Sequence, residues 1–374
     1  MKEFDNGLQE KWDFDLDAPS ETEVSIGKLK KFLKPSDTLI FYGGEPLLQI
    51  EKIKEIMDNV DARFCMQTNG KLLDKLPPEY VNKISKILVS IDGSRERTDF
   101  NKGEGTYDLV LKNLKLIRSR GFEGEIVARM VISQEFPDVF EQVKHLAELA
   151  LNGHTLSGHE NNQELREPLQ GLQAGDSGEP GVFDSVHWQL DAGFYKFDFD
   201  EEKFSEFVER YNNSILKLIE YWIAQMENGE VLRLYPFVAI MDSLLKNEDS
   251  KLRCGSGHTN YTITTNGNLV ACPIMGCVKN FYCGNLESEK LKQIFVGEPC
   301  VSCDYLKICG GRCLYSNQAK LWPHEGEELI CKSVKHLIDE LSRGLPSVKN
   351  LIKKGKISEK DFEYEKYFGP EIIP

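Results

Sequence analysis

Cysteine placement is the most restrictive feature of this sequence. Nine of the ten cysteines lie between Cys254 and Cys331, and the preceding residues contain only Cys65. The chain opens at Met1 with a polar, acidic stretch that has neither a basic, apolar leader nor a small-residue cleavage site, so we expect no secretory signal and a cytoplasmic location. Clustered cysteines in a reducing compartment are more often metal ligands than disulfides. The sequence therefore predicts metal binding in the carboxyl-terminal third.

Charge and length exclude several classes of protein. The 374 residues carry 46 basic and 60 acidic side chains, a net charge of −14, which repels nucleic acid and anionic membranes. No apolar run approaches the roughly 18 residues that a membrane span requires. The length favours one large α/β domain with an appendage, or two domains. We therefore expect a globular protein with no nucleic-acid or membrane partner.

Strand-like and helical segments alternate through the first half of the chain. Short β-branched runs predict strands at residues 38–42, 63–68, 86–91, 125–132 and 185–190. Segments with apolar residues at helical spacing lie between them, at residues 47–60, 78–84, 106–121 and 137–151. Such βα repetition implies a parallel sheet whose functional groups gather at the carboxyl ends of the strands.

Two other segments depart from this repeat. Residues 153–182 are rich in Gly, Gln, Glu and Asn and poor in large apolar residues, so we expect a surface insertion or a disordered loop. Residues 201–229 carry a long apolar stripe, which predicts a packed bridging helix.

A glycine-rich turn follows the first predicted strand. Gly43 and Gly44 allow the backbone to approach a ligand closely, and the carboxylate of Glu45 can accept hydrogen bonds from an ammonium group. A tight βα turn with no ligand is the structural alternative.

The surrounding motifs resemble those of radical S-adenosylmethionine (SAM) enzymes, whose GGE motif grips the methionine amino group of SAM. After the GGE run, further matches follow in order as QTNG, VSIDG, GEGTYD and ARM, at residues 67–70, 89–93, 103–108 and 128–130. The resemblance implies that Asn69 and Ser90 lie near the ribose or methionine of SAM. It also implies that Arg129 pairs with the SAM carboxylate, a contact that the bidentate guanidinium suits. Turn capping by Asn69 and Ser90, and an ordinary ion pair of Arg129, are the alternatives.

The cysteine region resembles the SPASM domain of radical SAM peptide maturases. From Cys300 the pattern is CxxC, then five residues to Cys309, three to Cys313 and seventeen to Cys331. Cys254 lies upstream, followed by Gly267 and Cys272 at the spacings of that domain. Seven cysteines and a glycine match the pattern.

The resemblance implies two auxiliary [4Fe-4S] clusters, because soft thiolates suit iron and each cubane takes at most four of them. One cluster would be held by Cys300, Cys303, Cys309 and Cys331. The other would be held by Cys254, Cys272 and Cys313, with Cys277, Cys283 or an open corner in the fourth position. Two zinc sites of four cysteines each are the alternative.

The family's CxxxCxxC loop, which holds the cluster that binds SAM, is absent from this sequence. In the family that loop follows the first strand of a six-stranded partial barrel, and the GGE strand is the second. The fold class expected is therefore α/β, a partial (β/α)6 radical SAM barrel without its first strand, followed by a small Cys-rich SPASM domain. We expect these residues not to cleave SAM, which would need a third [4Fe-4S] cluster on a restored amino-terminal segment.

The resemblance also sets expectations for domains and function. We place the barrel at residues 1–235, the SPASM domain at 236–345 and a carboxyl-terminal tail at 346–374. The implied activity is that of an oxidoreductase, similar to anaerobic sulfatase maturases and to thioether-forming or cross-linking peptide maturases. Such enzymes abstract hydrogen from a peptide residue with a 5′-deoxyadenosyl radical. The implied partners are a peptide or protein substrate and a flavodoxin- or ferredoxin-like reductant.

Two alternatives to this activity stay open. One is a non-catalytic iron-sulfur or peptide-binding protein derived from the same family. The other is a zinc-stabilised scaffold. No catalytic side chain can be named from the sequence.

Overall fold

A computed structural model describes residues 12–15, 19, 21–151, 181–191, 199–320 and 322–374. The predicted insertion at 153–182 lies outside the described residues, except for its last two positions. Of these two, Val182 is buried in the core.

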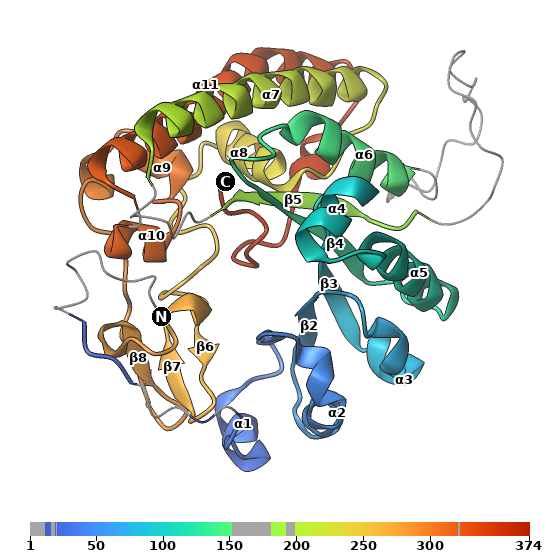
Figure 1. The fold of residues 1–374 in the computed structure, drawn as a ribbon, viewed down its shortest axis with the longest axis vertical. Coiled ribbons are helices and arrows are strands. Elements are labelled where there is room, and N and C mark those ends of the chain that lie inside the picture. Colours follow the sequence, from blue (N-terminus) through green and yellow to red (C-terminus); the bar gives the residue numbers. More distant parts are fainter. Residues whose placement is uncertain (1–11, 16–18, 20, 152–180, 192–198, 321) are drawn as a thin grey trace.

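The main sheet has five parallel strands in sequential order. They are β1 (Thr38–Phe41), β2 (Arg63–Thr68), β3 (Ile84–Ser90), β4 (Glu125–Ile132) and β5 (Ser185–Leu190). Figure 1 shows that the strands curve around a central space in which the carboxyl-terminal end of the chain also lies. The predicted α/β fold with a five-stranded parallel sheet is therefore confirmed.

Helices cover the outer face of this sheet. They are α2 (Ile50–Asn59), α3 (Pro78–Val81), α4 (Arg95–Lys102), α5 (Thr106–Ser119) and α6 (Val139–Leu151). Side chains alternate between the two faces of a strand. On β4, Ile126 and Met130 point outward into the main core, whereas Val127 points inward and packs with Cys65 and Leu88 of the neighbouring strands. We call the surface that carries Val127, Cys65 and Leu88 the inner face.

Three further helices close one side of the molecule. They are α7 (Glu201–Glu227), α8 (Tyr235–Lys246) and α11 (His324–Lys353). Figure 1 shows α7 and α11 running alongside each other, and α7 is the packed helix that the apolar stripe predicts. The division expected at residue 345 falls inside α11, which continues through Pro346 to Lys353. Residues 346–353 thus belong to that helix and do not begin a separate tail.

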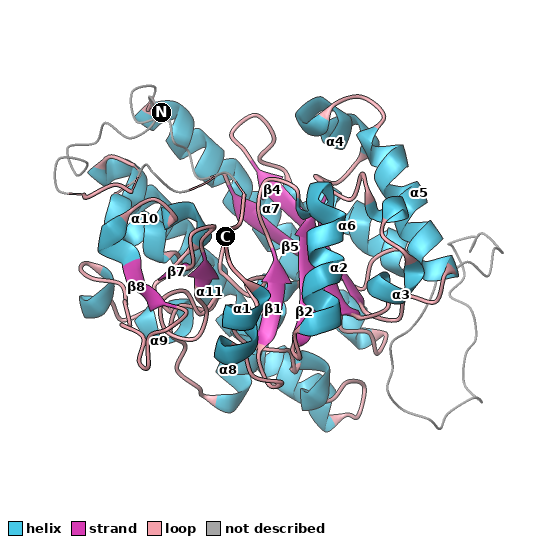
Figure 2. Ribbon diagram, turned by 90° about the horizontal axis from the view of Figure 1, so that it is seen from below, coloured by secondary structure: helices cyan, strands magenta, loops and turns pink. Residues whose placement is uncertain are grey.

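The cysteine region is built from short elements. A small antiparallel sheet contains β6 (Thr262–Ile263), β7 (Asn268–Val270) and β8 (Tyr282–Asn285), and two short helices follow, α9 (Leu306–Cys309) and α10 (Leu314–Ala319). Figure 2 shows this sheet on the side of the main sheet opposite to α2 and α5. Helix α1 (Ile26–Phe32) precedes β1.

Short 3-10 turns are also present in the described part of the chain. They lie at Pro46–Gln49, Leu73–Lys75, Pro273–Met275, Lys279–Phe281, Cys300–Ser302 and Glu359–Phe362. Within the described ranges, no helix combines the length and the apolar composition that crossing a bilayer requires.

Candidate functional site

The turn after β1 is held to the end of β2 by the Glu45 carboxylate. Its Oε1 accepts hydrogen bonds from the Leu47 amide at 3.1 Å and from the Thr68 hydroxyl at 2.7 Å, and its Oε2 accepts from the Asn69 amide at 2.8 Å. A carboxylate has about four acceptor positions, so these three bonds leave capacity for one more donor. Gly43 beside it is exposed, and a Cβ there would meet nothing within 4 Å. The geometry thus brings Glu45 and Asn69 together.

Asn69 also shapes its own turn. Its side-chain oxygen accepts a hydrogen bond from the Lys71 amide at 2.9 Å. This contact is the turn capping that was the alternative to a role of Asn69 in SAM binding. It does not use the side-chain NH2 group of Asn69.

Ser90 and Arg129 are register partners on adjacent strands, β3 and β4. The Arg129 guanidinium donates to Gln189 on β5 at 2.7 Å. Burial lowers the pKa of Arg129, and the charge of Tyr42 acts in the opposite direction. This guanidinium contact is to a neutral amide, and it is therefore not an ion pair across the barrel.

The carboxyl end of the inner face is open to solvent. Tyr42, which follows β1, is 47% exposed, and Val131 near the end of β4 is 39% exposed although it sits in a central strand. Ser90, Arg129 and Gln189 are partly exposed on the same face. A ligand can therefore reach the side chains that the motifs single out.

Asp92, after β3, stabilises this edge from within. Its Oδ1 accepts from the Val131 amide at 3.1 Å, and its Oδ2 lies 3.1 Å from Lys102 Nζ and accepts from Asn101 at 3.0 Å. The structure thus gives Asp92 the turn-shaping role that its place beside Gly93 suggests.

Farther down the inner face, His187 on β5 is only 1% exposed. Burial lowers its pKa well below the usual value, and the positive charge of Arg129 lowers it further. Neither ring nitrogen makes a hydrogen bond of normal geometry to a described residue, and the backbone of Ile372 is the polar group that faces the ring. His187 is therefore a neutral, covered side chain in this structure.

Cys254, Cys272 and Cys313 form the first cysteine group. Burial raises the pKa of Cys254 to about 11 and that of Cys272 to about 12, and in each case the nearby Cys313 thiol adds to the increase. The Cys313 thiol is thus a neighbour of both Cys254 and Cys272. Ser256 makes a 3.1 Å contact with the Cys254 sulfur.

Cys300, Cys303, Cys309 and Cys331 form the second cysteine group. Burial raises the pKa of Cys300, and the neighbouring Cys331 raises it further. Burial also raises the pKa of Cys331, and Cys303 adds to that increase. Burial raises the pKa of Cys309 to about 11, and Cys300 adds to this effect. The same four residues are grouped by the sequence pattern.

Backbone amides face the second group. The amides of Gly311 and Arg312 donate toward Cys309 and thereby lower its pKa somewhat, and Asn317 donates to the Cys300 sulfur at 3.4 Å. Gly310 and Gly311 have φ values of 70° and 89°, and a Cβ on Gly311 would meet Val296 at 2.7 Å. The glycine pair is therefore required for the close loop that aims these amides at sulfur.

Cys277 and Cys283 have different surroundings. Cys277 is exposed, and its carbonyl accepts from the Asp15 amide at 2.7 Å. Cys283 is buried on β8, where burial raises its pKa and Lys292 lowers it. Neither thiol is among the main influences on the pKa of Cys254 or of Cys272.

Arg253 is a functional candidate that the motifs do not reveal. Its buried guanidinium donates to the Ile308 carbonyl at 2.6 Å, to the Ala239 carbonyl at 3.0 Å and to the Ser243 hydroxyl at 3.0 Å. It thereby joins the loop of Cys254 to the helix that carries Cys309 and to α8. No sequence motif marks it, because an isolated arginine next to a cysteine has no characteristic spacing.

The thiols do not converge on a single ion. Among the residues that the structure describes, no three side chains of His, Cys, Asp or Glu are arranged to hold one metal ion. A tetrahedral zinc site with 2.3 Å bonds would bring its sulfurs to within about 3.8 Å of one another. In a cubane each thiolate binds a different iron, so the sulfurs need not meet at one point.

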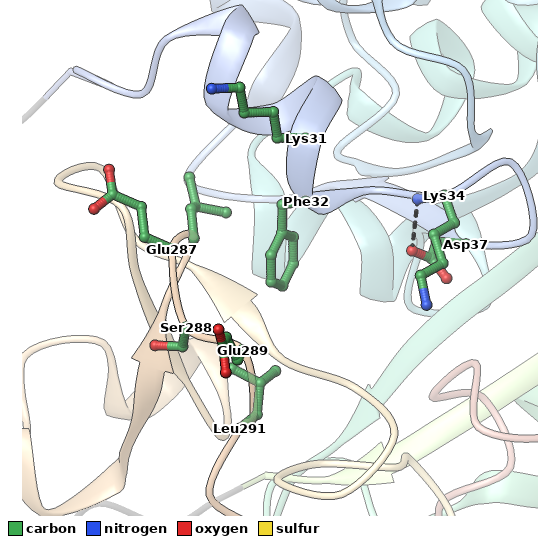
Figure 3. Close-up of a pocket in the computed structure, with 9 residues that line it drawn as sticks. Lys31, Phe32, Lys34, Asp37, Glu287, Ser288, Glu289 and Leu291 are labelled. Atoms are coloured by element: carbon green, nitrogen blue, oxygen red, sulfur yellow. Dashed lines mark hydrogen bonds between the residues drawn. The ribbon is translucent and has the colours of Figure 1, made fainter.

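A groove of about 600 Å³ lies elsewhere, between α1 and the loop after β8. Figure 3 shows Phe32 between Lys31 and Lys34 on one side and Glu287 and Leu291 on the other. Lys34 and Asp37 precede β1, so the groove lies at the amino end of that strand, away from the Glu45 turn.

A protein-family model matches part of the amino-terminal half of the chain. Residues 13–161 match the model of the radical SAM superfamily. A cysteine-type anaerobic sulfatase-maturating enzyme of Clostridium perfringens (strain 13 / Type A) is 21% identical over 366 residues, which cover 88% of this chain and 89% of that protein. An uncharacterized protein of Archaeoglobus fulgidus is 31% identical over 100 residues, covering 25% of this chain and 24% of its own length.

Solved structures share the fold. Native anSMEcpe with bound AdoMet has a TM-score of 0.61 at 17% identity, and the match covers 90% of this chain and 93% of that one. Native anSMEcpe with bound AdoMet and Cp18Cys peptide has a TM-score of 0.59 at 17% identity, covering 87% and 90%. Residues 13–161 are therefore a radical SAM domain, in a chain that is homologous to an anaerobic sulfatase-maturating enzyme.

Proposed function

We propose that this protein binds SAM at the carboxyl edge of β1–β4 and acts on a peptide or protein substrate as a radical SAM peptide-modifying enzyme. The observation that carries the proposal is the coincidence of the GGE turn, Asn69, Ser90 and Arg129 on one solvent-accessible edge. The relative with bound AdoMet and peptide supports both ligands by analogy of fold.

The edge offers groups that complement SAM. The remaining acceptor position of Glu45 suits the methionine ammonium group, and the Arg129 guanidinium suits the methionine carboxylate. The side chains of Asn69 and Ser90 are polar neighbours for the ribose. SAM cleaved at a reduced [4Fe-4S] cluster supplies a radical that abstracts hydrogen, and the residues named here bind and orient the molecule.

We further propose that the two cysteine groups hold auxiliary [4Fe-4S] clusters. Six of the seven cysteines are partly buried, and amides and Asn317 already face the sulfurs of the second group, as expected for groups that tune a cluster. A flavodoxin- or ferredoxin-like protein would supply the electrons.

A second candidate function has one specific observation in its favour. The 374 residues contain no CxxxCxxC run. We propose that these residues alone bind SAM without cleaving it, and act as an iron-sulfur or peptide-binding protein unless a further segment supplies three thiolates. Adding reductant and SAM to reconstituted protein, with 5′-deoxyadenosine measured by chromatography, separates the two functions.

Calorimetric titration with SAM tests the binding site. Arg129→Lys keeps the charge but loses the guanidinium fork, so we expect at least a tenfold loss of SAM affinity. Arg210→Gln, at an exposed position of α7, serves as the control and should bind as the unaltered chain does.

A matched ligand sharpens this titration. Affinity for 5′-deoxyadenosine, which lacks the methionine carboxylate, should not change in Arg129→Lys. Equal SAM affinity in Arg129→Lys and the unaltered chain would contradict the assigned contact, and absence of SAM binding to the unaltered chain would contradict the proposed function.

A further inference from the structure

The last residues of the sequence lie against the inner face of the sheet. We call residues 364–374 the inner-face segment. Phe368 is 6% exposed, and Glu371 and Ile373 are each 1% exposed. Figure 1 shows the end of this segment within the curve of the strands, and Figure 2 places it between the main sheet and the cysteine region.

The segment contacts the barrel at two levels. Near the amino end of β3, Lys86 Nζ lies 4.1 Å from the centre of the Phe368 ring, and Phe368 packs with Cys65 and Val127. Higher up, the backbone of Ile372 faces His187, whose register partner on β4 is Arg129. The segment therefore fills the inner face from Lys86 up to the level of Arg129.

The segment also contacts the loop of Cys254. The Asn260 amide donates to the Cys254 carbonyl at 2.6 Å and to the Tyr367 carbonyl as well. The Tyr367 ring lies edge-on to His258, with centroids 5.2 Å apart, and a Cβ on Gly255 would approach the Tyr367 Cβ at 3.0 Å. One side chain thus ties the segment directly to the residue that begins the first cysteine group.

A local turn gives the segment a fixed shape. The Glu371 carboxylate accepts from the Phe368 amide at 2.9 Å and from the Gly369 amide at 2.8 Å. Gly369 has a φ of 109°, which a glycine adopts at little cost. The buried carboxylate is therefore satisfied within the segment itself.

We propose that the inner-face segment is a wall shared by the candidate SAM site and the first cysteine group. It closes the amino-terminal part of the inner face, so that a ligand entering at the carboxyl edge reaches no deeper than the level of Arg129 and His187. Through Tyr367 and Asn260 it also fixes the position of the Cys254 loop relative to that edge. The statement about ligands rests on the proposed function, whereas the statement about packing does not.

Alkylation of Cys65 tests the packing. Cys65 is fully buried on the inner face next to Phe368, and burial raises its pKa to about 11. Full-length protein is treated with iodoacetamide under native conditions, and modification of Cys65 is followed by peptide mass spectrometry. Two variants open the wall, Phe368→Ala and deletion of residues 370–374. Phe100→Ala, at a 72% exposed position of α4, is the control.

We expect Cys65 to react at least tenfold faster in both wall variants than in the unaltered chain and in Phe100→Ala. Modification of the exposed Cys277 should be equal in all four proteins, which shows that each receives the same effective dose of reagent. Circular dichroism shows which variants are folded. If the deletion variant does not fold, Phe368→Ala still decides the result. Protection of Cys65 in folded Phe368→Ala, or rapid reaction in the unaltered chain, would overturn the proposal.

A spectroscopic readout tests the link to the first cysteine group. Tyr367→Ala and Phe100→Ala are reconstituted with iron and sulfide, and their electron paramagnetic resonance spectra are compared at equal iron content. We expect an altered signal from one cluster in Tyr367→Ala only. Identical spectra would overturn the positioning role, whereas an unaltered chain that binds no iron would instead contradict the proposed function.

Discussion

The barrel half and the cysteine region are stabilised in different ways. The five strands are covered on their outer face by helices that bury a continuous apolar core, which includes Leu114, Ile126 and Met130. The cysteine region has only short strands, short helices and turns, and burial raises the pKa values of its thiols Cys254 and Cys272. We therefore expect the barrel to be stabilised mainly by apolar contacts, and the cysteine region to gain stability from the group that its thiols are proposed to bind.

The largest expected effect is loss of one cluster on removal of a ligand. Cys309→Ser removes a member of the second cysteine group, so iron in the reconstituted protein should fall from about eight to about four per chain. Cys65→Ser, in the barrel, is the matched control and should retain about eight. Iron is measured by atomic absorption. The comparison fails if both variants lose iron equally or if neither does.

Stability of the barrel should depend on its apolar core. Leu114→Ala on α5 removes a fully buried side chain and should lower the free energy of unfolding by about 2–5 kcal/mol in urea titrations. Leu109→Ala lies on the same helix at a 39% exposed position and should cost less than about 1 kcal/mol. Iron binding should be unchanged in both variants. A similar loss of stability in the two would contradict the assignment of α5 to the core.

Glycine substitutions separate backbone strain from crowding in the cysteine region. The Cβ added by Gly311→Ala would lie 2.7 Å from Val296. The Cβ added by Gly105→Ala, at a position that also has a positive φ, would have no atom within 4 Å. We expect Gly311→Ala to be the more destabilising by about 1–3 kcal/mol and to weaken iron retention. Thermal unfolding and iron content check this. Equal stability and equal iron content in the two variants would show that the loop around Cys309 can accommodate a Cβ at Gly311.

The smallest expected effect concerns pH. The pKa of His187 is lowered in the folded protein, so the unfolded chain takes up a proton below about pH 6.5 that the folded chain does not. Stability is therefore fully present above this pH and falls by about 1.4 kcal/mol per pH unit below it. His187→Gln should remove this part of the dependence of stability on pH. Urea titrations at about pH 5.2 and about pH 6.2 measure it.

The control for this experiment is His324→Gln on α11. The His324 side chain is 79% exposed, and its substitution should leave the slope unchanged. If both variants have the slope of the unaltered chain, His187 is reached by solvent and the inner-face segment does not cover it.

The sequence predicts the barrel strands well and the rest of the inner face poorly. Strands β4 and β5 have the predicted bounds because their β-branched runs are flanked by polar or glycine-containing segments. The 3-10 turn at Pro46–Gln49 delays the start of α2 to Ile50, because Glu45 turns back to cap that turn. Helix α11 continues past Gly344 and Pro346, since packing along α7 outweighs the local preference of those two residues.

Some parts of the candidate site could not be predicted from the sequence. The two cysteine groups are those that the resemblance implies and stay a prediction, whereas the hydrogen bond between the Glu45 carboxylate and the Asn69 amide was not predicted. Arg253 and the inner-face segment carry no such pattern, because their partners are distant in sequence and are brought together only by the tertiary fold. Tertiary contacts of this kind have no periodic signal in the chain.

Iron and acid-labile sulfide analysis of the anaerobically reconstituted chain, with its electron paramagnetic resonance spectrum, tests the central claim most directly. The account predicts about eight irons and eight sulfides per chain, with signals of two [4Fe-4S] clusters after reduction. Zinc in place of iron, or a colourless protein with no iron, would contradict it.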